Sequence, residues 1–524
     1  MRINGFRLNK AIEKYSRVVI YGCGKRATEI YIMLQKYKKK TEFCIANEEN
    51  TADVFARKAI PVYKMEECND SINNDMVLII SVEEGSEKAA EKILQEQGIK
   101  NYLFISQFDR SSVWHLKNYR NKNIQEGIEE IAEWYIDGAD DSSSLEIAEE
   151  RRRIEGAISR GKNENVIIFS IGVFTPRSLK IAEALKGRGY KVKVFINPGG
   201  YVLKICESGL EKLNLECVKC STIEELMYRM IMERGEVIHL FTNRTKSAVD
   251  RVLIQMRELF SPIVYDEYDI VNGFYVSIPQ DIMENERFCL ENASAICNRG
   301  YELDYLAEDS NYSICAKTIQ FPDYCNNEQC DSEINENDLS ICYVGQIFVG
   351  QNDSSDRWLL ELADMCKKNQ CHFHVYPNKL DEVEHSAYIE HDKTNFYFHF
   401  HKPVPCDEMK FEISKYDYGV HPVTKEAMQD GCAFYKKEKM TYATTNKFFD
   451  YLDAGLPIVA AGPIKLAEYF EEKGVLLKKT IEEYDFEELR NRKKELKANV
   501  STVRKAMQIE NHIDELLEFY KALV

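Results

Sequence analysis

Short apolar runs alternate with stretches of helical period along most of this chain, and this order predicts parallel α/β sheets. Turn residues separate the runs, and the pattern occurs in three blocks. In the first block we expect one small doubly wound sheet, with strands at Arg17–Tyr21, Phe43–Ala46, Met76–Ser81 and Tyr102–Ile105 and helices at Arg26–Tyr37 and Glu87–Gln97.

The second and third blocks repeat the same order. In the second, strands are expected at Val166–Ser170, Lys191–Ile196 (followed by a turn at Gly199-Gly200), Val237–Phe241 and Ile263–Asp266. In the third, strands are expected at Ser340–Gly345, His372–Tyr376, Phe396–Phe400, Tyr418–His421 and Pro457–Ala460. The predicted fold class is therefore α/β, with three Rossmann-like parallel-sheet domains.

Changes in composition suggest where these domains begin and end. A charged stretch of helical period follows the first block, and a run rich in Asn, Asp and Glu at 323–337 is typical of a surface linker. We predict a Rossmann-like domain at 1–120, a helical connector at 121–160, domains at 161–335 and 336–480, and a helical tail at 481–524.

Composition and charge narrow the class of protein. A chain of 524 residues needs several cores, and its apolar runs are too short to span a membrane or to form a signal peptide. The net charge of -17 disfavours nucleic acid as a partner, and the 16 scattered cysteines suit a reducing compartment. We expect a cytoplasmic protein, with a peripheral membrane contact left open by basic clusters at Lys36–Lys40 and Arg490–Lys497.

The segment Thr444–Val459 carries the clearest functional pattern. A helix beginning near Asn446 offers free N–H groups to diphosphate oxygens, which the helix dipole favours, and Lys447 can neutralise their charge. Asp450, one turn later, can accept hydrogen bonds from two ribose hydroxyls. By pattern alone, an ordinary amphipathic helix before a buried strand explains the segment equally well.

This segment resembles the donor-site helix of family-4-like GT-B glycosyltransferases, in which Asn-Lys-x-x-Glu-Tyr-x-x-x-Gly-x-Pro-Val is common. Ser340–Gly345 resembles the first strand and glycine loop of that family's C-terminal lobe, and Phe396–Val404 resembles its strand and His-containing turn. The resemblance implies an acceptor lobe at 161–335, a donor lobe at 336–480, a nucleotide-diphosphate sugar as substrate, and neither cofactor nor essential metal. It implies donor contacts at Gly345, Gln346, His401, Asn446, Lys447, Asp450 and Tyr451.

Three positions depart from the family's pattern. Gln346 replaces an arginine that serves the donor pyrophosphate, and Tyr442 stands near the place of the first acid of the retaining members. Only Gly172 is present where a short glycine-rich loop is usual in the acceptor lobe. These departures leave the stereochemical outcome open, and they support a non-catalytic, nucleotide-sugar-binding scaffold as the alternative.

An inverting transfer needs a base that takes the proton of the acceptor hydroxyl. Asp266 and Asp269 follow a predicted strand end, where α/β sheets place ligands, and they rank first. His239 lies inside the strand Val237–Phe241, where a buried core histidine is the better interpretation.

Two pairs of histidines invite a metal interpretation. His372 and His374, and likewise His399 and His401, alternate along two predicted strands and so share a face. No Cys or carboxylate at ligand spacing joins them, so we expect no metal and place His401 near the donor phosphates.

The first block carries a dinucleotide-type loop, with Gly22, Gly24 and Ala27 after a strand. The next predicted strand ends in Ala46-Asn47, where a ribose-binding acid is expected. This block resembles the small Rossmann-like domain of sugar O-acyltransferases and other polysaccharide-biosynthesis proteins, which implies nucleotide-sugar binding or an interaction module. A nicotinamide dehydrogenase is a weaker alternative, because no catalytic set accompanies the loop.

The sequence thus predicts a hexosyltransferase-type enzyme that moves a sugar from a nucleotide-sugar donor to a glycan, lipid-linked glycan or protein acceptor in surface polysaccharide or glycoconjugate biosynthesis. A nucleotide-sugar epimerase of GT-B shape is a further alternative, since it would need no acceptor.

Overall fold

The computed structural model divides the chain into two compact units, which we describe separately. The first comprises residues 1–160 and 220–232, and the second comprises 161–219 and 233–524. The structure describes residues 122–136, 144–242, 248–308, 312–326, 338–347 and 359–524, and, within the first 121 residues, 2–4, 12, 14–22, 27, 30, 31, 34, 39–45, 60–64, 67, 72, 75–81, 87–107, 116 and 119.

The first unit contains a six-stranded parallel sheet in the order β1-β6-β5-β2-β3-β4. Alternate residues of β2 face two separate apolar clusters, Val18 and Ile20 in one and Val19 and Tyr21 in the other, so both faces of the sheet are covered. Its described elements are β1 (Arg2–Asn4), β2 (Arg17–Tyr21), β3 (Thr41–Ile45), β4 (Val62–Tyr63), β5 (Met76–Ile80), α5 (Glu87–Glu96) and β6 (Tyr102–Gln107).

Two helices follow this sheet, α7 (Ile124–Ile136) and α8 (Ser144–Ile158). They belong to the first unit together with most of α11 (Ile223–Glu233). Tyr135 of α7 stacks on Tyr228 of α11 with ring centroids 4.8 Å apart, and the Tyr119 hydroxyl donates a 2.9 Å hydrogen bond to Glu224. Segments about 100 residues apart in the chain are thus joined within the first unit.

The second unit begins with a seven-stranded parallel sheet, which we call the first lobe, in the order β13-β12-β11-β10-β7-β8-β9. Its strands are β7 (Asn163–Phe174), β8 (Lys191–Val202), β9 (Glu216–Lys219), β10 (Gly235–Phe241), β11 (Ile263–Glu267), β12 (Ala295–Asn298) and β13 (Lys317–Gln320). Its helices are α9 (Pro176–Gly187), α10 (Glu207–Lys212), α12 (Ala248–Gln255), α13 (Val271–Phe274), α14 (Gln280–Asn292) and α15 (Glu302–Glu308), with short 3-10 turns at Lys204–Cys206 and Arg257–Leu259.

The expected turn at Gly199-Gly200 is not a turn, because β8 runs through both glycines to Val202. The pairing of β7 with β8 shifts register between Ile171 and Val173, and Gly199 adopts a φ of 78°. A Cβ on Gly200 would lie 2.7 Å from the carbonyl oxygen of Gly172. The glycines therefore permit an irregular, closely approaching stretch of two paired strands.

The second lobe carries a six-stranded parallel sheet in the order β16-β15-β14-β17-β18-β19. Its strands are β14 (Leu339–Gly345), β15 (Cys371–Pro377), β16 (Phe398–Phe400), β17 (Tyr418–His421), β18 (Ile458–Ala460) and β19 (Leu476–Leu477). Its helices are α16 (Leu359–Lys368), α17 (Ser386–Thr394), α18 (Met409–Ile413), α19 (Lys425–Asp430), α20 (Lys437–Tyr442), α21 (Asn446–Asp453) and α22 (Ile464–Glu472), with a 3-10 turn at Ile481–Glu483.

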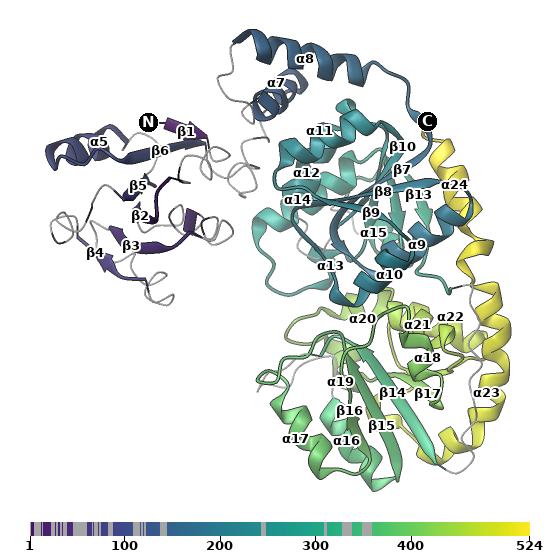
Figure 1. Cartoon of the computed structure of the whole chain (residues 1–524). Helices are drawn as coiled ribbons and strands as arrows, with labels where there is room; N and C mark the ends of the chain where they lie inside the picture. Colours follow the sequence, from purple (N-terminus) through teal and green to yellow (C-terminus); the bar gives the residue numbers. More distant parts are fainter. Residues whose placement is uncertain are drawn as a thin grey trace. The chain divides into compact units, whose positions relative to one another are not determined.

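The end of the chain packs on both lobes (Figure 1). Helix α23 (Phe486–Ala506) packs its apolar side on the second lobe, and after a 3-10 turn at Ile509–Asn511 helix α24 (Ile513–Lys521) completes the core of the first lobe. The basic cluster at 490–497 is partly used inside the fold, because buried Lys493 lies 3.4 Å from Asp417 and buried Lys497 donates to the carbonyl of Tyr416.

The predicted fold class of three Rossmann-like parallel sheets is confirmed. One part of the expected linker at 323–337 is buried core instead, since Asp323, Tyr324 and Cys325 are each at most 5% exposed. Asp323 is buried because it pairs with two arginines of the first lobe. Among the described residues, no helix has the length and apolarity that a membrane span requires.

Candidate functional site

A cavity of about 200 Å³ lies between the two lobes of the second unit, and we call it the main pocket. Its lining residues follow the carboxyl ends of strands on both sides. In the first lobe Thr175, Leu203 and Tyr268 come after β7, β8 and β11, and in the second lobe Gln346 and Asn378 come after β14 and β15. Parallel sheets bind ligands at these strand ends, so both sheets present their binding edge to one space.

Helix α21 supplies three of the predicted donor contacts to this pocket, Asn446, Lys447 and Asp450. The chain is extended at Thr445 and becomes helical at Asn446, which leaves the first N–H groups of α21 free of intrahelical partners. Thr444, one residue before Thr445, is bound by the first lobe. Glu302 of that lobe accepts hydrogen bonds from the Thr444 backbone N–H at 2.7 Å and from the Thr444 hydroxyl at 3.1 Å. The start of the helix is thereby fixed against both lobes.

The turn after β14 brings the backbone close to Lys447. Gly345 has a φ of 115°, and a Cβ added to it would lie 3.1 Å from Cε of Lys447. Only glycine combines this conformation with such a close approach. Lys447 is only 7% exposed. Its ammonium therefore lies directly over the glycine turn and beside Gln346 in the same pocket.

Asp450 sits at the boundary between the two lobes. Its carboxylate lies 3.7 Å from the Lys180 ammonium of α9, which also donates 3.0 Å hydrogen bonds to Asp453 and to the carbonyl of Tyr324. Burial raises the pKa of Asp450 to about 6; Lys180 opposes this rise and the Asp453 carboxylate adds to it. With one quarter of its side chain exposed, Asp450 remains accessible to a ligand in the main pocket.

A second cavity of about 90 Å³ shares Tyr268, Asn446 and Lys447 with the main pocket. Its other walls carry several basic groups, Arg299, His421 and Lys439, together with Asp269. The N-terminus of α21 therefore lies between two adjoining spaces, a larger one with more apolar walls and a smaller, more basic one.

Tyr451 does not line either space, and we reassign it to the core. Its side chain is fully buried, its hydroxyl accepts from the Val344 backbone N–H and donates to the carbonyl of Val420, and a Cβ on Gly419 would lie 2.0 Å from its ring. Position 451 is thus on the inward face of α21, one residue past the side chain that faces the pocket.

His401 does not line the main pocket either, but it lies one ring away. It stacks on Tyr376, a pocket residue, with centroids 4.2 Å apart and planes at 5°. Burial lowers the pKa of His374 to about 2, and burial also lowers the pKa of its neighbours His399 and His401. These imidazoles are therefore neutral at pH 7 and supply no cation to a phosphate.

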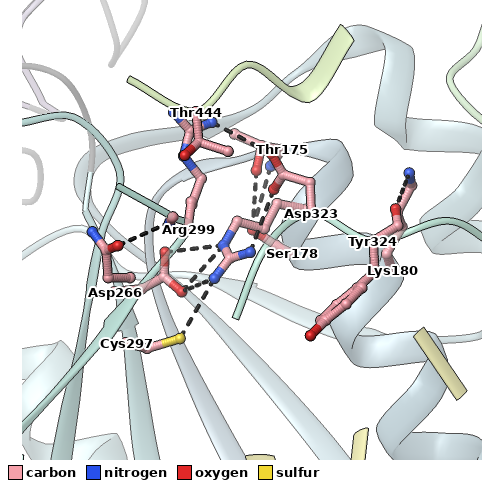
Figure 2. Close-up of polar contacts among 12 residues, drawn as sticks. Thr175, Ser178, Lys180, Asp266, Cys297, Arg299, Asp323, Tyr324 and Thr444 are labelled. Atoms are coloured by element: carbon pink, nitrogen blue, oxygen red, sulfur yellow. Dashed lines mark hydrogen bonds and ion pairs between the residues drawn. The ribbon is translucent and has the colours of Figure 1, made fainter. Parts of the chain in front are cut away.

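Two of the three candidate bases are structural, Asp266 and His239. Arg177 holds the Asp266 carboxylate through both Nε and Nη2, the latter at 2.9 Å. Figure 2 shows Asp266 beside Cys297. Nε2 of His239 lies 2.9 Å from Asp266, and its Nδ1 is hydrogen-bonded with the Tyr520 hydroxyl of α24. Burial opposes ionisation of Asp266, but Arg177 and His239 outweigh it and lower its pKa.

Asp269 is the one candidate base that lines a cavity, the smaller one. It accepts a 2.6 Å hydrogen bond from the Tyr275 hydroxyl, and both Arg299 and Lys439 approach to 3.4 Å. These three groups contact both carboxylate oxygens of Asp269. Asp269 is therefore placed at the site but strongly engaged.

The predicted loop of the first unit is only partly described, because Gly24 lies outside the described residues. Gly22 has a φ of 110°, and a Cβ there would lie 2.5 Å from Oγ of Ser81. Ala27 is buried in the cluster that covers one face of the sheet. Packing thus explains Gly22 and Ala27, and binding by this loop stays a prediction.

The sequence did not single out several residues that build the site, namely Lys180, Glu302, Tyr376 and Cys406. The position of Tyr376 at a predicted strand end was a usable signal. Lys180 and Glu302 gave none, because their partners lie 273 and 142 residues away in the chain.

Two cysteines from opposite lobes meet beside the main pocket. Sγ of Cys206 and Sγ of Cys406 are 3.8 Å apart, and the Cys406 N–H donates to the carbonyl of Ile205 at 2.8 Å. We expect diamide to oxidise this pair to a disulfide, with both thiol hydrogens passing to the reagent, because a small approach brings the sulfurs to bonding distance. Peptide mapping under non-reducing conditions will detect the cross-link.

Cys206→Ser and Cys406→Ser should each abolish the cross-link, whereas Cys217→Ser should retain it. Cys217 is also in the first lobe but exposed, with no sulfur partner among the described cysteines. Cross-links from Cys206 to other cysteines at equal yield would contradict this arrangement of the lobes.

Several solved structures are similar to this chain. A glycosyltransferase from Rickettsia africae ESF-5 matches at 9% identity and a TM-score of 0.49, over 70% of this chain and 99% of that one. The pneumococcal O-GlcNAc transferase GtfA, in complex with UDP and GlcNAc, matches at 9% and 0.41, over 57% and 60%. The S. aureus MnaA–UDP structure matches at 9% and 0.41, over 68% and 97%. No protein-family model matches the sequence, and no curated protein matches it.

Such distant likenesses say nothing about substrate, and the geometry itself establishes the fold. Two parallel α/β lobes present their strand ends to a shared pocket, and the last helix returns from the second lobe to the first. The second unit therefore has the GT-B arrangement that the sequence predicted.

Proposed function

We propose that the second unit is a glycosyltransferase that uses a nucleotide-diphosphate sugar. The observation that carries this proposal is the convergence of Asn446, Lys447 and Asp450 with the Gly345–Gln346 turn in one pocket between two lobes. The turn and the helix lie about 100 positions apart in the chain, and the pocket offers both a cation and helix N–H groups for phosphate oxygens.

In this proposal the nucleoside occupies the main pocket, where Asp450 accepts hydrogen bonds from the ribose hydroxyls. The diphosphate lies at the start of α21 under Lys447, which compensates for Gln346 at the place of the family's arginine. The sugar extends into the smaller cavity, where Asp269 is the candidate base. No step needs a metal or a cofactor, because side chains and the helix end supply the positive charge.

We further propose that the acceptor is a glycan, a lipid-linked glycan or a protein in surface polysaccharide or glycoconjugate biosynthesis, reached from the cytoplasm. The resemblance of the second unit to family-4-like enzymes supports this choice. The apolar face of α24 is packed into the first lobe, so a peripheral membrane contact would have to use another surface.

A thermal-shift screen of the full chain tests the proposal. We expect one of the UDP, GDP, CMP or dTDP sugars to raise the unfolding temperature, because a ligand that binds only the folded state stabilises it. NAD serves as the comparison for the first unit. The absence of a shift with every sugar nucleotide would contradict the proposal.

One observation favours a non-catalytic scaffold as the second candidate. Tyr442, near the place of the family's first acid, donates a 2.5 Å hydrogen bond to Glu308 and lines neither cavity. A scaffold would bind the sugar nucleotide without consuming it. Release of free nucleotide over time, measured with the sugar nucleotide that the screen identifies, would eliminate this candidate.

Donor affinity should depend on pH through Asp450. The carboxylate is the form that accepts ribose hydrogen bonds, so affinity should be constant above a pH of about 6 and fall as the pH decreases below it, by up to tenfold per pH unit. Calorimetric titration between pH 5 and 8 measures the profile. Asp450→Asn should flatten it, which separates Asp450 from Glu302, whose pKa burial raises to about 7.

The raised pKa of Asp450 makes folding stability depend on pH in the opposite direction from donor affinity. Because the folded protein holds the Asp450 proton more tightly than the unfolded chain, this residue favours folding at low pH, and its contribution is lost as the pH rises through about 6. An affinity that increased as the pH fell would contradict the ribose role.

A further inference from the structure

Four histidines form a continuous stack on one side of the second lobe, outside both cavities. His372 and His374 alternate along β15, and His399 and His401 lie in and directly after β16. The register of these strands pairs His374 with His399. Since side chains two residues apart share a face, backbone pairing alone brings His372, His374 and His399 together.

The ring nitrogens are at distances that suit a shared ion. Nδ1 of His372 lies 2.8 Å from Nε2 of His399, and one nitrogen from each of His372, His374 and His399 lies within 4.8 Å of the other two. Imidazoles bound to one tetrahedral Zn²⁺ place their nitrogens about 3.3 Å apart. The imidazole nitrogens would therefore have to move by about 1–1.5 Å to complete such a site, and small χ rotations allow this movement.

These rings have no other hydrogen-bonding partner in the part of the chain that the structure describes. His372 bonds with His399, and His374 bonds with His401 at 3.0 Å; no carboxylate or backbone oxygen orders any of the four. Half-buried imidazoles that hydrogen-bond only with one another leave several ring nitrogens to solvent or to an ion. By contrast, the cluster of His239, Asp266 and Cys297 already holds the Arg177 guanidinium, a cation, at its centre.

We propose that His372, His374 and His399 bind one Zn²⁺ or a similar borderline transition ion, with the fourth position open to water. Imidazole ligands suit Zn²⁺, Ni²⁺ and Cu²⁺, whereas Mg²⁺ and Ca²⁺ prefer oxygen. His401, bonded to His374, fixes the tautomer of that ligand. The sequence alone shows two separate pairs of histidines and no third ligand for either pair. The register of β15 with β16 brings His399 to the pair on β15 as the third ligand.

The ion would join the edge strand β16 to β15, and it would act on stability rather than on sugar transfer. The stack continues from His374 through His401 to Tyr376 of the main pocket. This site and the proposed transfer activity are independent, and either can fail without the other.

The test titrates ZnCl₂ into the chelator-treated full chain by calorimetry and by thermal shift. We expect one equivalent bound and a higher unfolding temperature, both lost in His372→Asn/His399→Asn. His401→Asn should bind about 10–100-fold more weakly. His512→Asn changes a partly exposed histidine that directly precedes α24, and this variant should bind as the unmodified chain does. The same number of Zn²⁺ equivalents in the unmodified chain and the double variant would overturn the proposal.

CoCl₂ provides a second measurement on the unmodified chain, which no folding defect of a variant can obscure. Visible bands of nitrogen-coordinated Co²⁺ without a thiolate charge-transfer band would support the three-histidine site. A thiolate band would place the ion on cysteines, and no visible band at one equivalent would show that the site does not form; either result overturns the proposal.

Discussion

Asp450→Ala should abolish measurable donor binding while the second unit stays folded. A carboxylate that accepts two hydroxyl hydrogen bonds contributes about 1.5–3 kcal/mol for each, so affinity should fall by at least about 100-fold. The fold should tolerate the change, since burial raises the pKa of Asp450 and ionised Asp450 is itself unfavourable in the folded state at pH 7. Calorimetry with the sugar nucleotide identified by the screen measures the affinity, and circular dichroism checks the fold.

The matched controls separate the ribose role from charge alone. Asp450→Asn keeps one acceptor oxygen and should bind with intermediate affinity, whereas Asp430→Ala removes an exposed carboxylate of the same lobe and should change nothing. An Asp450→Ala variant that still bound donor within about threefold of the unmodified chain would remove Asp450 from the site. Lost binding together with a lost unfolding transition would instead show that the variant does not fold.

The strands were predictable because each is a short apolar run with turn chemistry on both sides. The predicted strands Arg17–Tyr21 and Tyr418–His421 match β2 and β17, and the predicted start of a helix at Asn446 matches α21. The pattern failed where glycine serves a close approach, as at Gly199-Gly200, because glycine is typical of a turn and of an irregular strand alike.

The second-lobe half of the site was predictable for a different reason. Asn446, Lys447 and Asp450 lie within one turn and a half of one helix, so sequence spacing already places them together. The prediction that Tyr451 contacts the donor was wrong, because the inward and pocket-facing sides of a short helix are separated by a single position. The contribution of the first lobe depends on contacts between distant segments, such as Lys180 with Asp450, which no local pattern encodes.

Asp266 shows why a position at the end of a strand does not by itself identify a base. The residue ends the predicted strand and lies inside β11, where Arg177 from α9 and His239 from β10 bind its carboxylate, and Asp323 binds the other side of the same guanidinium at 3.4 Å. All of these side chains are buried. A charge network of this kind positions α9 and α24 on the sheet rather than exchanging protons with a substrate.

Arg177→Met should therefore be the most destabilising of the substitutions considered, by about 3–5 kcal/mol, because it leaves the buried Asp266 carboxylate without its cation and leaves buried Asp323 with Arg299 alone. Urea unfolding of the full chain, with the transition of the second unit followed separately, measures the change in free energy of unfolding. Arg188→Met is the matched control: Arg188 also pairs with an aspartate, Asp514, through two nitrogens, but at the surface, and its loss should cost at most about 1 kcal/mol.

Removing the charge of Asp266, the partner of Arg177, distinguishes the effect of a charge network from a simple loss of packing. In Arg177→Met/Asp266→Asn the stranded carboxylate is gone, so the double variant should be more stable than the sum of the two single changes predicts. Asp266→Asn alone should retain donor turnover per folded molecule, since Asp266 touches neither cavity. Strictly additive losses would contradict the pairing. A folded Asp266→Asn chain without turnover would return Asp266 to the list of candidate bases, and the Arg177 contact would then be the device that keeps that base ionised.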